Sequence, residues 1–327
     1  MRTRIAVVLL FLLAAAPASG QGQPVRLRSA YSTIGIGHSL VWVAKESGAF
    51  KENGIDLQLL FIGSSTTATQ AVLAGDIPLA IMAGGAAISS ALSGSDLVML
   101  ASLKKDPSQA YLAVAKNITS AAQLRGKKLG VSRLGSASDF LLKYILKKLG
   151  LTPADVTIVQ VGNSPLRMAA LANGAIDGAA LSYEEMSVAK RMGFTILLDV
   201  SALGIEGLTS DVVTTRRYAR ESRDVALRYI KSFARGLSVY LKNKKFTMDV
   251  IAKYTRSEDR EKIEIGYEHF AKTFLKKPYP AMGGVQLALE EIGERTPAAK
   301  SARPEQFVDN SLVKELDDSG YFDALYK

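Results

Sequence analysis

The sequence predicts an α/β protein made of two similar, doubly wound units, and two observations lead to this class. Strand-like and helix-like segments alternate along the chain, which is typical of parallel sheets. The same order of segments then returns at an offset of 99 residues. Four matched pairs mark the repeat: Gly63 and Gly162, Gly75 and Gly174, Ile77 and Ile176, and Ala80 and Ala179. Because parallel strands carry their loops at their carboxyl ends, each unit should present its loops along one edge.

The elements of the first unit follow from local patterns. Alternation over residues 25–29 predicts a strand, and a glycine-containing loop follows over 31–37. A helix is expected from Ser39 to Asn53, ended by Gly54. The remaining predicted elements are a strand over 55–62, a helix opened by residues 63–66 and closed by Gly75, and a strand over 77–82 that leads to Gly84 and Gly85.

The second unit repeats this plan. Its predicted elements are a strand over 128–132, a glycine-serine loop over 135–138, a helix over 140–149, a strand over 156–161, a helix opened by residues 162–165 and a strand over 176–181. Two short β-prone segments, 109–114 and 210–215, flank this unit. If these two segments pair, the second unit is an insertion in the first, and the chain crosses between the units twice.

The remaining chain, from about Arg217, is expected to be mostly helical. Ala226, Ile230, Phe233, Leu237 and Leu241 recur at three- and four-residue spacing and form one apolar stripe. Basic residues occupy another face of the same helix: Arg228, Lys231 and Arg235. That face is interpreted as solvated, with a docking surface for a partner as the alternative.

The first twenty residues have the pattern of a secretory signal. Arg2 and Arg4 precede an apolar run over residues 5–16, and small residues follow at Ala16 and Ala18. The run is too short for a permanent membrane anchor, since a spanning helix needs about 20 apolar residues. We therefore predict a signal peptide over 1–20 and an exported, soluble, periplasmic product.

The composition limits the kinds of catalytic and metal-binding sites that the chain can form. The chain has 327 residues, 48% of them hydrophobic, and a net charge of +10, which permits attraction to anions without specifying one. It has no cysteine and only two histidines, His38 and His269. This excludes disulfides, thiolate metal sites and cysteine nucleophiles, and leaves little for imidazole chemistry. Dinucleotide, P-loop and nucleophile-elbow patterns are also missing. We expect no catalytic residue, no metal and no cofactor.

Polar loops that open helices are the main candidates for binding. A helix N-terminus carries unpaired amides and partial positive charge, so several such ends at one crevice bind a small oxyanion. Each serine in these loops also has a purely structural interpretation as a helix cap. Arg133 follows a predicted strand and could hold a carboxylate or sulfonate, whereas Arg167 is expected at the surface. Core packing is the alternative for Tyr31 and Tyr183, and His38 is a weaker candidate.

The sequence also resembles a known family, the periplasmic solute-binding proteins of ABC importers for nitrate, sulfonates, taurine and thiamine-precursor pyrimidines. The matching stretches are residues 44–56, 71–77, 124–131, 135–136, 170–179 and 307–320. A related branch of pyrimidine-synthesising enzymes uses a cysteine-rich motif, which this chain lacks. The resemblance implies a type II periplasmic-binding-protein-like fold, in which two lobes joined by crossing strands hold one ligand in the cleft between them.

These arguments give an expected domain division and site. Lobe I should comprise residues 21–110 and 216–327, and lobe II residues 111–215. From the loops and from the resemblance, the expected ligand-binding residues are Tyr31, Ser32, Gly37, His38, Ser64, Ser65, Gly84, Gly85, Arg133, Gly135, Ser136, Asn163, Ser164, Tyr183 and Glu184.

The expected function is capture of a small organic anion, sulfonate- or carboxylate-like, and its delivery to an inner-membrane ABC permease. The protein should act as a monomer, touch the membrane only by docking to the permease, and bind no nucleic acid. One alternative is a periplasmic enzyme or sensor on the same fold, with Glu184, His38 or Arg133 in catalytic roles. Another is an interaction module that presents its basic helices to an acidic partner.

Overall fold

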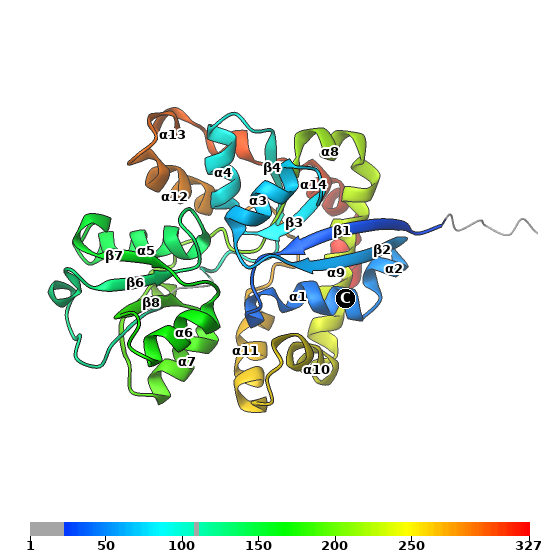
Figure 1. Cartoon of the computed structure of the whole chain (residues 1–327). Coiled ribbons are helices and arrows are strands. Elements are labelled where there is room, and N and C mark those ends of the chain that lie inside the picture. The colour runs from blue at the N-terminus through cyan, green and yellow to red at the C-terminus, as the bar shows by residue number, and fades with distance from the viewer. Residues whose placement is uncertain (1–22, 108–110) are drawn as a thin grey trace, which may run out of the picture.

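The computed structural model describes residues 23–107 and 111–327. It contains two five-stranded mixed sheets, each with its own helices (Figure 1). We call the first sheet with its helices lobe I and the second sheet with its helices lobe II. The predicted signal segment, 1–20, lies outside the described residues. Within the described part of the chain, none of the helices combines the length and the apolar character needed to cross a membrane.

The two sheets have equivalent strand orders, β2-β1-β3-β10-β4 and β7-β6-β8-β5-β9. The strands of lobe I are β1 Val25–Tyr31, β2 Ile55–Phe61, β3 Leu79–Met82, β4 Leu97–Ser102 and β10 Asp211–Thr215. The strands of lobe II are β5 Tyr111–Val114, β6 Lys128–Val131, β7 Thr157–Gln160, β8 Gly178–Leu181 and β9 Thr195–Asp199. In each sheet the first three strands are parallel, and the fourth is antiparallel to both of its neighbours.

Helices are more numerous in lobe I. Its helices are α1 Ser39–Glu46, α2 Ala49–Glu52, α3 Ser65–Leu73, α4 Gly84–Leu92, α8 Arg216–Glu221, α9 Arg223–Lys242, α10 Lys244–Thr255, α11 Arg260–Thr273, α12 Met282–Gly293, α13 Pro297–Ser301, α14 Ser311–Asp318 and α15 Tyr321–Leu325. Those of lobe II are α5 Ala137–Lys148, α6 Ser164–Ala172 and α7 Tyr183–Arg191. Short 3-10 turns include η1 Ile36–His38.

The structure confirms the internal repeat. Helices α3 and α6, strands β3 and β8, and helices α4 and α7 begin and end at residues that are 99 apart. The predicted helix over 39–53 is instead divided into α1 and α2, because Gly48 between them has a left-handed backbone with φ 81°. The apolar stripe of the C-terminal region is confirmed within α9, whose Ala226, Ile230, Phe233 and Leu237 are all buried.

The two short β-prone segments that flank the second unit do not pair with each other. β5 lies between β8 and β9 in lobe II, and β10 lies between β3 and β4 in lobe I. Residues 109 and 110 of the first segment lie outside the described chain. The second unit is still inserted in the first, but its expected boundary at residue 215 is wrong, because β10 completes the sheet of lobe I. The pairing partner of a short strand depends on where the tertiary structure places it. Local sequence alone does not predict that partner.

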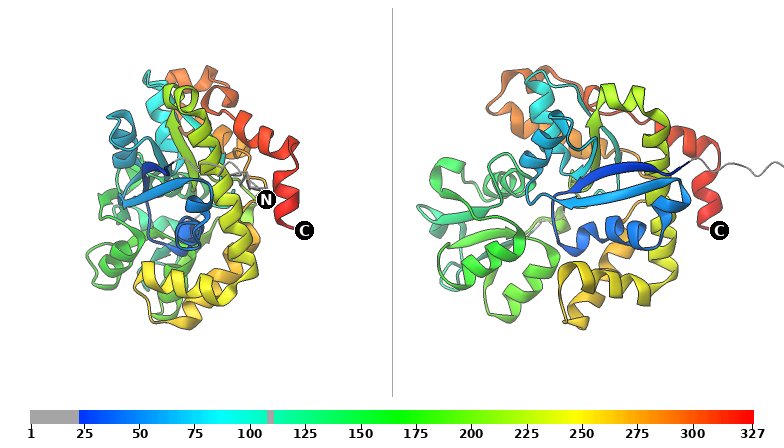
Figure 2. Two further views of the ribbon diagram at one scale, coloured as in Figure 1. Left: turned by 90° about the vertical axis from the view of Figure 1, so that its right-hand side faces the viewer. Right: turned by 45° about the vertical axis from the view of Figure 1, so that its right-hand side comes forward.

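The segments that cross between the lobes lie just outside these strands. The Leu103 amide donates to the Ser210 carbonyl at 2.9 Å, and the Gly207 amide donates to the Lys105 carbonyl at 2.6 Å. The Thr209 hydroxyl adds a bond to the Asp106 carbonyl at 3.1 Å. The two crossings are therefore held side by side, and both lobes meet at this narrow connection (Figure 2).

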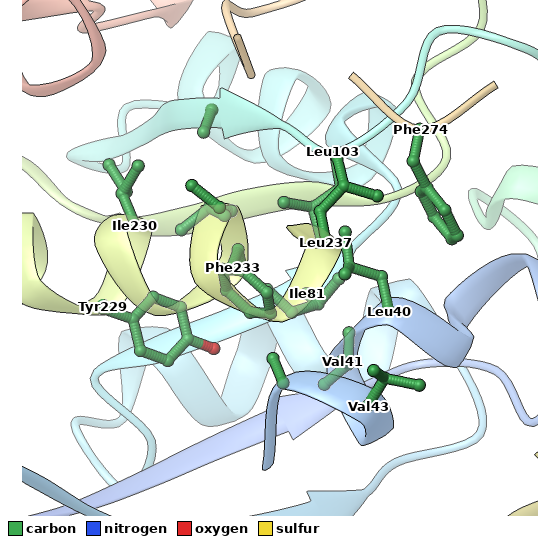
Figure 3. Close-up of a cluster of buried hydrophobic side chains, with 14 of the residues drawn as sticks. Leu40, Val41, Val43, Ile81, Leu103, Tyr229, Ile230, Phe233, Leu237 and Phe274 are labelled. Carbon is green, nitrogen blue, oxygen red and sulfur yellow. The ribbon is translucent and has the colours of Figure 1, made fainter. Parts of the chain in front are cut away.

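The sheet of lobe I is buried on both faces, and β3 shows how. Leu79 and Ile81 point into one core cluster, and Ala80 and Met82 into another, as the two-residue period of a strand requires. The first cluster is formed largely by α1 and α9 (Figure 3), where Phe233 is only 1% exposed. Helices α3, α4 and α12 cover the other face.

Close packing of α9 on α1 leads to a stability prediction. A Cβ placed on Gly236 would lie 2.4 Å from the Ala44 Cβ and 2.6 Å from its Cα. Gly236→Ala should therefore lower the free energy of unfolding by about 1–3 kcal/mol through overpacking, although alanine normally stabilises a helix interior by roughly 1 kcal/mol. Urea denaturation measures this. Gly293→Ala is the matched control, because its Cβ would meet mainly the flexible Lys300 side chain at 3.2 Å; equal losses in both variants would contradict the packing argument.

Candidate functional site

A polar pocket lies between the lobes, where the carboxyl ends of parallel strands from both sheets face each other. It encloses about 360 Å³ of space, its open mouth included. Lobe I contributes the ends of β1, β2 and β3, lobe II the ends of β6 and β7, and the crossing segment Thr209. The lining residues are Ser32, Thr33, His38, Gly63, Ser64, Ser65, Ala83, Ser132, Ala137, Asn163, Arg167 and Thr209. We call this space the polar pocket.

The N-terminus of α3 opens directly into the polar pocket. Ser64 is its N-cap residue, yet its side chain caps no amide. The Ser64 hydroxyl is buried and has no hydrogen-bond partner among the described residues. The first amides of a helix also lack partners within the helix. This helix end therefore presents a hydroxyl and free amides together, the combination that binds an oxyanion.

The neighbouring serine has a structural role, and the repeat reveals it. The Ser65 hydroxyl accepts a hydrogen bond from the Ala83 amide at 3.2 Å. Ser164, its equivalent in lobe II, accepts from the Ser182 amide, also at 3.2 Å. In both lobes the hydroxyl thus fastens the start of one helix to the end of the adjacent strand. Ser164 is not in the pocket lining, although it was an expected ligand-binding residue.

Arg167 is the residue of the site that sequence reasoning placed wrongly. It was expected at the surface, but it is fully buried in α6 and lines the polar pocket. Its Nε donates to the Ala180 carbonyl at 3.1 Å, and its Nη1 to the Gly162 carbonyl at 2.5 Å. Burial lowers the pKa of Arg167 to about 10, so the guanidinium remains charged at neutral pH.

A signal for this burial was present in the sequence. The buried residues of α6 are Ser164, Arg167, Met168 and Leu171, which follow the spacing of one helix face. Arg167 thus lies on the apolar stripe of its helix. Its equivalent in lobe I is the buried Ala68, so among the described residues that line the polar pocket the cation comes from lobe II.

His38 forms the wall of the polar pocket on the side of lobe I. Its side chain is buried, and neither ring nitrogen has a hydrogen-bond partner among the described residues. Burial, and secondarily the Lys104 ammonium, lower the pKa of His38 to about 3. The ring is therefore neutral at physiological pH and offers one N–H donor and one acceptor.

At two other helix starts an amide is already bonded by the protein itself, and at a third, that of α5, the N-cap Ser136 caps no amide. The Gly84 amide at the start of α4 donates to the Asp211 carboxyl at 2.9 Å. Burial raises the pKa of Asp211 to about 7, although its hydrogen bonds with Ser102 and Gly84 oppose this. At α6, the Asn163 side chain accepts from the Leu166 amide. At α5, the Ser136 hydroxyl donates to the Arg133 carbonyl at 2.6 Å.

Two expected residues lie where the lobes touch, outside the polar pocket. The Ile36 amide of lobe I donates to the Glu184 carboxyl of lobe II. Burial, reinforced by the neighbouring Glu185, raises the pKa of Glu184. Tyr183 stacks on His269 of α11 with ring centres 4.4 Å apart. Both residues therefore join lobe II to lobe I, and each lines an interlobe hollow separate from the polar pocket: Glu184 with Ile36 and Lys262, and Tyr183 with His269.

The remaining expected residues are dispersed. Arg133 is exposed and does not line the polar pocket. Tyr31 belongs to the core of lobe I, against Trp42 and Phe61. Gly37 lies beside Phe270, and Gly135 adopts φ +75° in the loop before α5. Gly85 packs against Phe140 of α5, since an added Cβ would lie 3.0 Å from that ring.

A comparison with protein-family models identifies the family of this chain. The model for NMT1/THI5-like proteins matches residues 36–245, which is more than half of the chain. The chain belongs to the NMT1/THI5-like family. The resemblance to solute-binding proteins of this kind is thus confirmed at the level of the family.

Individual proteins are similar to this chain in sequence or in fold. A curated Brucella abortus protein, named only as a binding protein, is 25% identical over 183 residues; the match spans 56% of either chain. The alkanesulfonate-binding protein SsuA of Xanthomonas axonopodis, solved bound to MOPS, has a TM-score of 0.71 at 18% identity, covering 90% of this chain and 98% of its own. The nitrate-binding protein NrtA of Synechocystis has a TM-score of 0.70 at 12% identity, covering 90% and 89%.

The neutral state of His38 predicts a pH dependence of stability in this NMT1/THI5-like protein. The unfolded histidine binds a proton below a pKa near 6.5, whereas the buried one does so only near 3. Acidification in this interval therefore favours the unfolded state. Relative to His38→Gln, the wild type should lose about 2 kcal/mol of unfolding free energy between about pH 7 and about pH 5. Chemical denaturation at both pH values measures it, and parallel pH profiles would contradict it.

The Gly85 contact predicts an effect on lobe closure. Gly85→Leu should push the Phe140 ring and α5 away from α4, because the space available is only that of a hydrogen atom. We expect a larger radius of gyration by small-angle X-ray scattering, because the overpacked contact holds the two lobes farther apart. The double variant Gly85→Leu/Phe140→Ala should regain the compact form. Persistence of the expansion in the double variant would rule out this contact as the cause.

Proposed function

We propose that this protein is the substrate-binding component of an ABC importer and that it captures a small organic anion in the polar pocket. The observation that carries the proposal is the convergence of unsatisfied polar groups at one interlobe space. The buried Ser64 hydroxyl and His38 ring have no partners among the described residues, and the Arg167 guanidinium lies in the same lining. Buried polar groups are normally hydrogen-bonded, so groups left without partners point to a ligand.

The chemistry of these groups favours an oxyanion. The free amides of α3 and the Ser64 hydroxyl are donors, neutral His38 adds one N–H, and Arg167 supplies the positive charge. A carboxylate or sulfonate offers two or three acceptor oxygens to such a set. The named activities of the solved neighbours, for alkanesulfonate and for nitrate, support an anion of this kind.

Capture works through closure of the lobes. Amides and hydroxyl come from lobe I, and the guanidinium comes from lobe II, so an anion contacts both sets only when the lobes are together. Binding therefore stabilises the closed form by the free energy of the contacts that the open form lacks. In this proposal the motion takes place at the paired crossing segments, which are the covalent links between the lobes.

The same proposal covers location and partners. The N-terminal signal pattern and the fold of the neighbours support export to the periplasm and delivery of the ligand to an inner-membrane permease. The arrangement of the site supports binding without chemical turnover. Glu184 is engaged by the Ile36 amide, Arg133 is exposed, and only His38 lines the polar pocket, so the three residues that an enzyme would combine lie apart.

Substitutions of the adjacent residues Ser64 and Ser65 test whether the polar pocket binds an anion. Ser64→Ala should weaken binding of methanesulfonate, acetate or nitrate, whichever binds best to the wild type, by roughly five- to tenfold, because one hydrogen bond to a charged group is lost. Its unfolding free energy should stay within about 0.5 kcal/mol of the wild type, since the hydroxyl has no partner in the protein. Isothermal titration calorimetry and urea denaturation measure the two quantities.

Ser65→Ala is the matched control. It removes the bond to the Ala83 amide and should cost about 1 kcal/mol of stability, with little direct effect on the anion. A Ser64→Ala variant that is destabilised but binds normally would contradict the proposed site. Absence of any bound anion in the wild type across the panel would contradict the proposed function itself.

A further inference from the structure

A second cavity continues from the polar pocket and is almost entirely apolar. It encloses about 560 Å³, its open mouth included, and shares Ala83, Ala137 and Thr209 with the polar pocket. These three residues lie at the boundary between the two cavities, so one ligand can extend through both. We call the second space the apolar arm.

Both lobes build the walls of the apolar arm. Phe140, Leu141 and Tyr144 project from α5 of lobe II, and Leu287 and Ala288 from α12 of lobe I. Helices α5 and α12 are sequence-distant but adjacent, on the side of the crossing where α4 also lies (Figure 1). A ligand body placed here would bury apolar surface against both lobes at once.

The apolar arm contains one carboxyl that the protein leaves unsatisfied. Glu206, at the rim, pairs with Lys105 at 3.0 Å and accepts from the Gly283 amide. Glu291, by contrast, has a buried Oε1 without a hydrogen-bond partner among the described residues. An unsatisfied buried oxygen in an apolar wall is costly unless a ligand group reaches it.

The charge state of Glu291 indicates which kind of ligand group would bind it. Burial raises the pKa of Glu291 to about 8, with Asp139 acting in the same direction and Lys143 against it. At neutral pH the carboxyl is therefore protonated and can both donate and accept. Lys143 already supplies a cation next to it, paired with Asp139. A neutral hydroxyl suits this position better than a second cation.

From this geometry we infer the substrate class: an amphipathic organic acid whose anionic head occupies the polar pocket, whose apolar body fills the arm, and whose far end carries a hydroxyl that meets Glu291. The inference rests on the proposed function for the head and adds the body and the far end. Both ends of the ligand then satisfy groups that the protein alone leaves without partners.

Graded probes test the apolar body. We expect straight-chain carboxylates from acetate to decanoate, measured by isothermal titration calorimetry, to gain about fourfold in affinity per methylene group until the arm is full. The matching sulfonates should show the same trend. Ala288→Phe fills the arm and should abolish the dependence on chain length. Ala288→Leu is a milder filling variant, and Gln286→Phe, on an exposed face of the same helix, is the control.

A second comparison tests the far end. ω-Hydroxy acids of the chain length that fills the arm should bind roughly tenfold more tightly than the unsubstituted acids of equal length. Glu291→Asp, which withdraws the carboxyl, should remove that advantage, whereas Glu290→Asp on the exposed face should keep it. An equal affinity for hydroxylated and plain acids in the wild type would overturn the role of Glu291.

The outcomes separate the two proposals. If short anions bind and chain length has no effect, the apolar arm is not part of the site, while the anion-binding function stands. If Ala288→Phe folds normally but keeps the dependence on chain length, the ligand body does not lie in the apolar arm as inferred. If no acid of either series binds, the proposed function fails, and the inference fails with it.

Discussion

The exchange of one strand between the two halves is the constraint on which the rest of the structure depends. Each sheet takes its fourth strand from chain that has just left the other half, β5 in lobe II and β10 in lobe I. The chain must therefore cross twice, and the crossings pair through the amides of Leu103 and Gly207. Because the sheets are joined at this point, the carboxyl ends of their parallel strands face each other. A shared pocket at those ends follows from this connection and needs no other element.

The repeat supplies a common scaffold, and the site arises where the two copies differ. Ser65 and Ser164 make the same bond in each lobe, which identifies them as parts of the scaffold. The residue before each of them differs: Asn163 caps its own helix, whereas the Ser64 hydroxyl has no partner among the described residues. One lobe thus retains free amides for a ligand. The other lobe places Arg167 where the first has Ala68, so the cation and the amides come from opposite sides of the pocket.

Local sequence was sufficient to predict the order of the helices and strands. The signals used, a glycine at the end of a helix and the spacing of apolar residues, depend on residues only a few positions apart. Local sequence was insufficient for β5 and β10, whose partner residues lie 64 to 133 positions away along the chain. It was also insufficient for Gly85, whose neighbour Phe140 belongs to the other lobe. The burial of Arg167 could have been predicted from the spacing of the buried residues in α6. It was missed because a charged residue in the first turn of a helix was expected to be exposed. Burial of that charge depends on carbonyls of Gly162 and Ala180, which tertiary structure brings together.

The contacts between the lobes are of two kinds with opposite effects on closure. At the rim, the Lys147–Glu294 pair at 2.7 Å is exposed, as are most of its counterparts, and such pairs contribute at most about 1 kcal/mol each. Inside, closure of an empty pocket buries His38 and Ser64 without partners, at a cost of about 1–3 kcal/mol for each group. In the capture that we propose, a ligand that bonds to both interior groups offsets this cost and so favours the closed form.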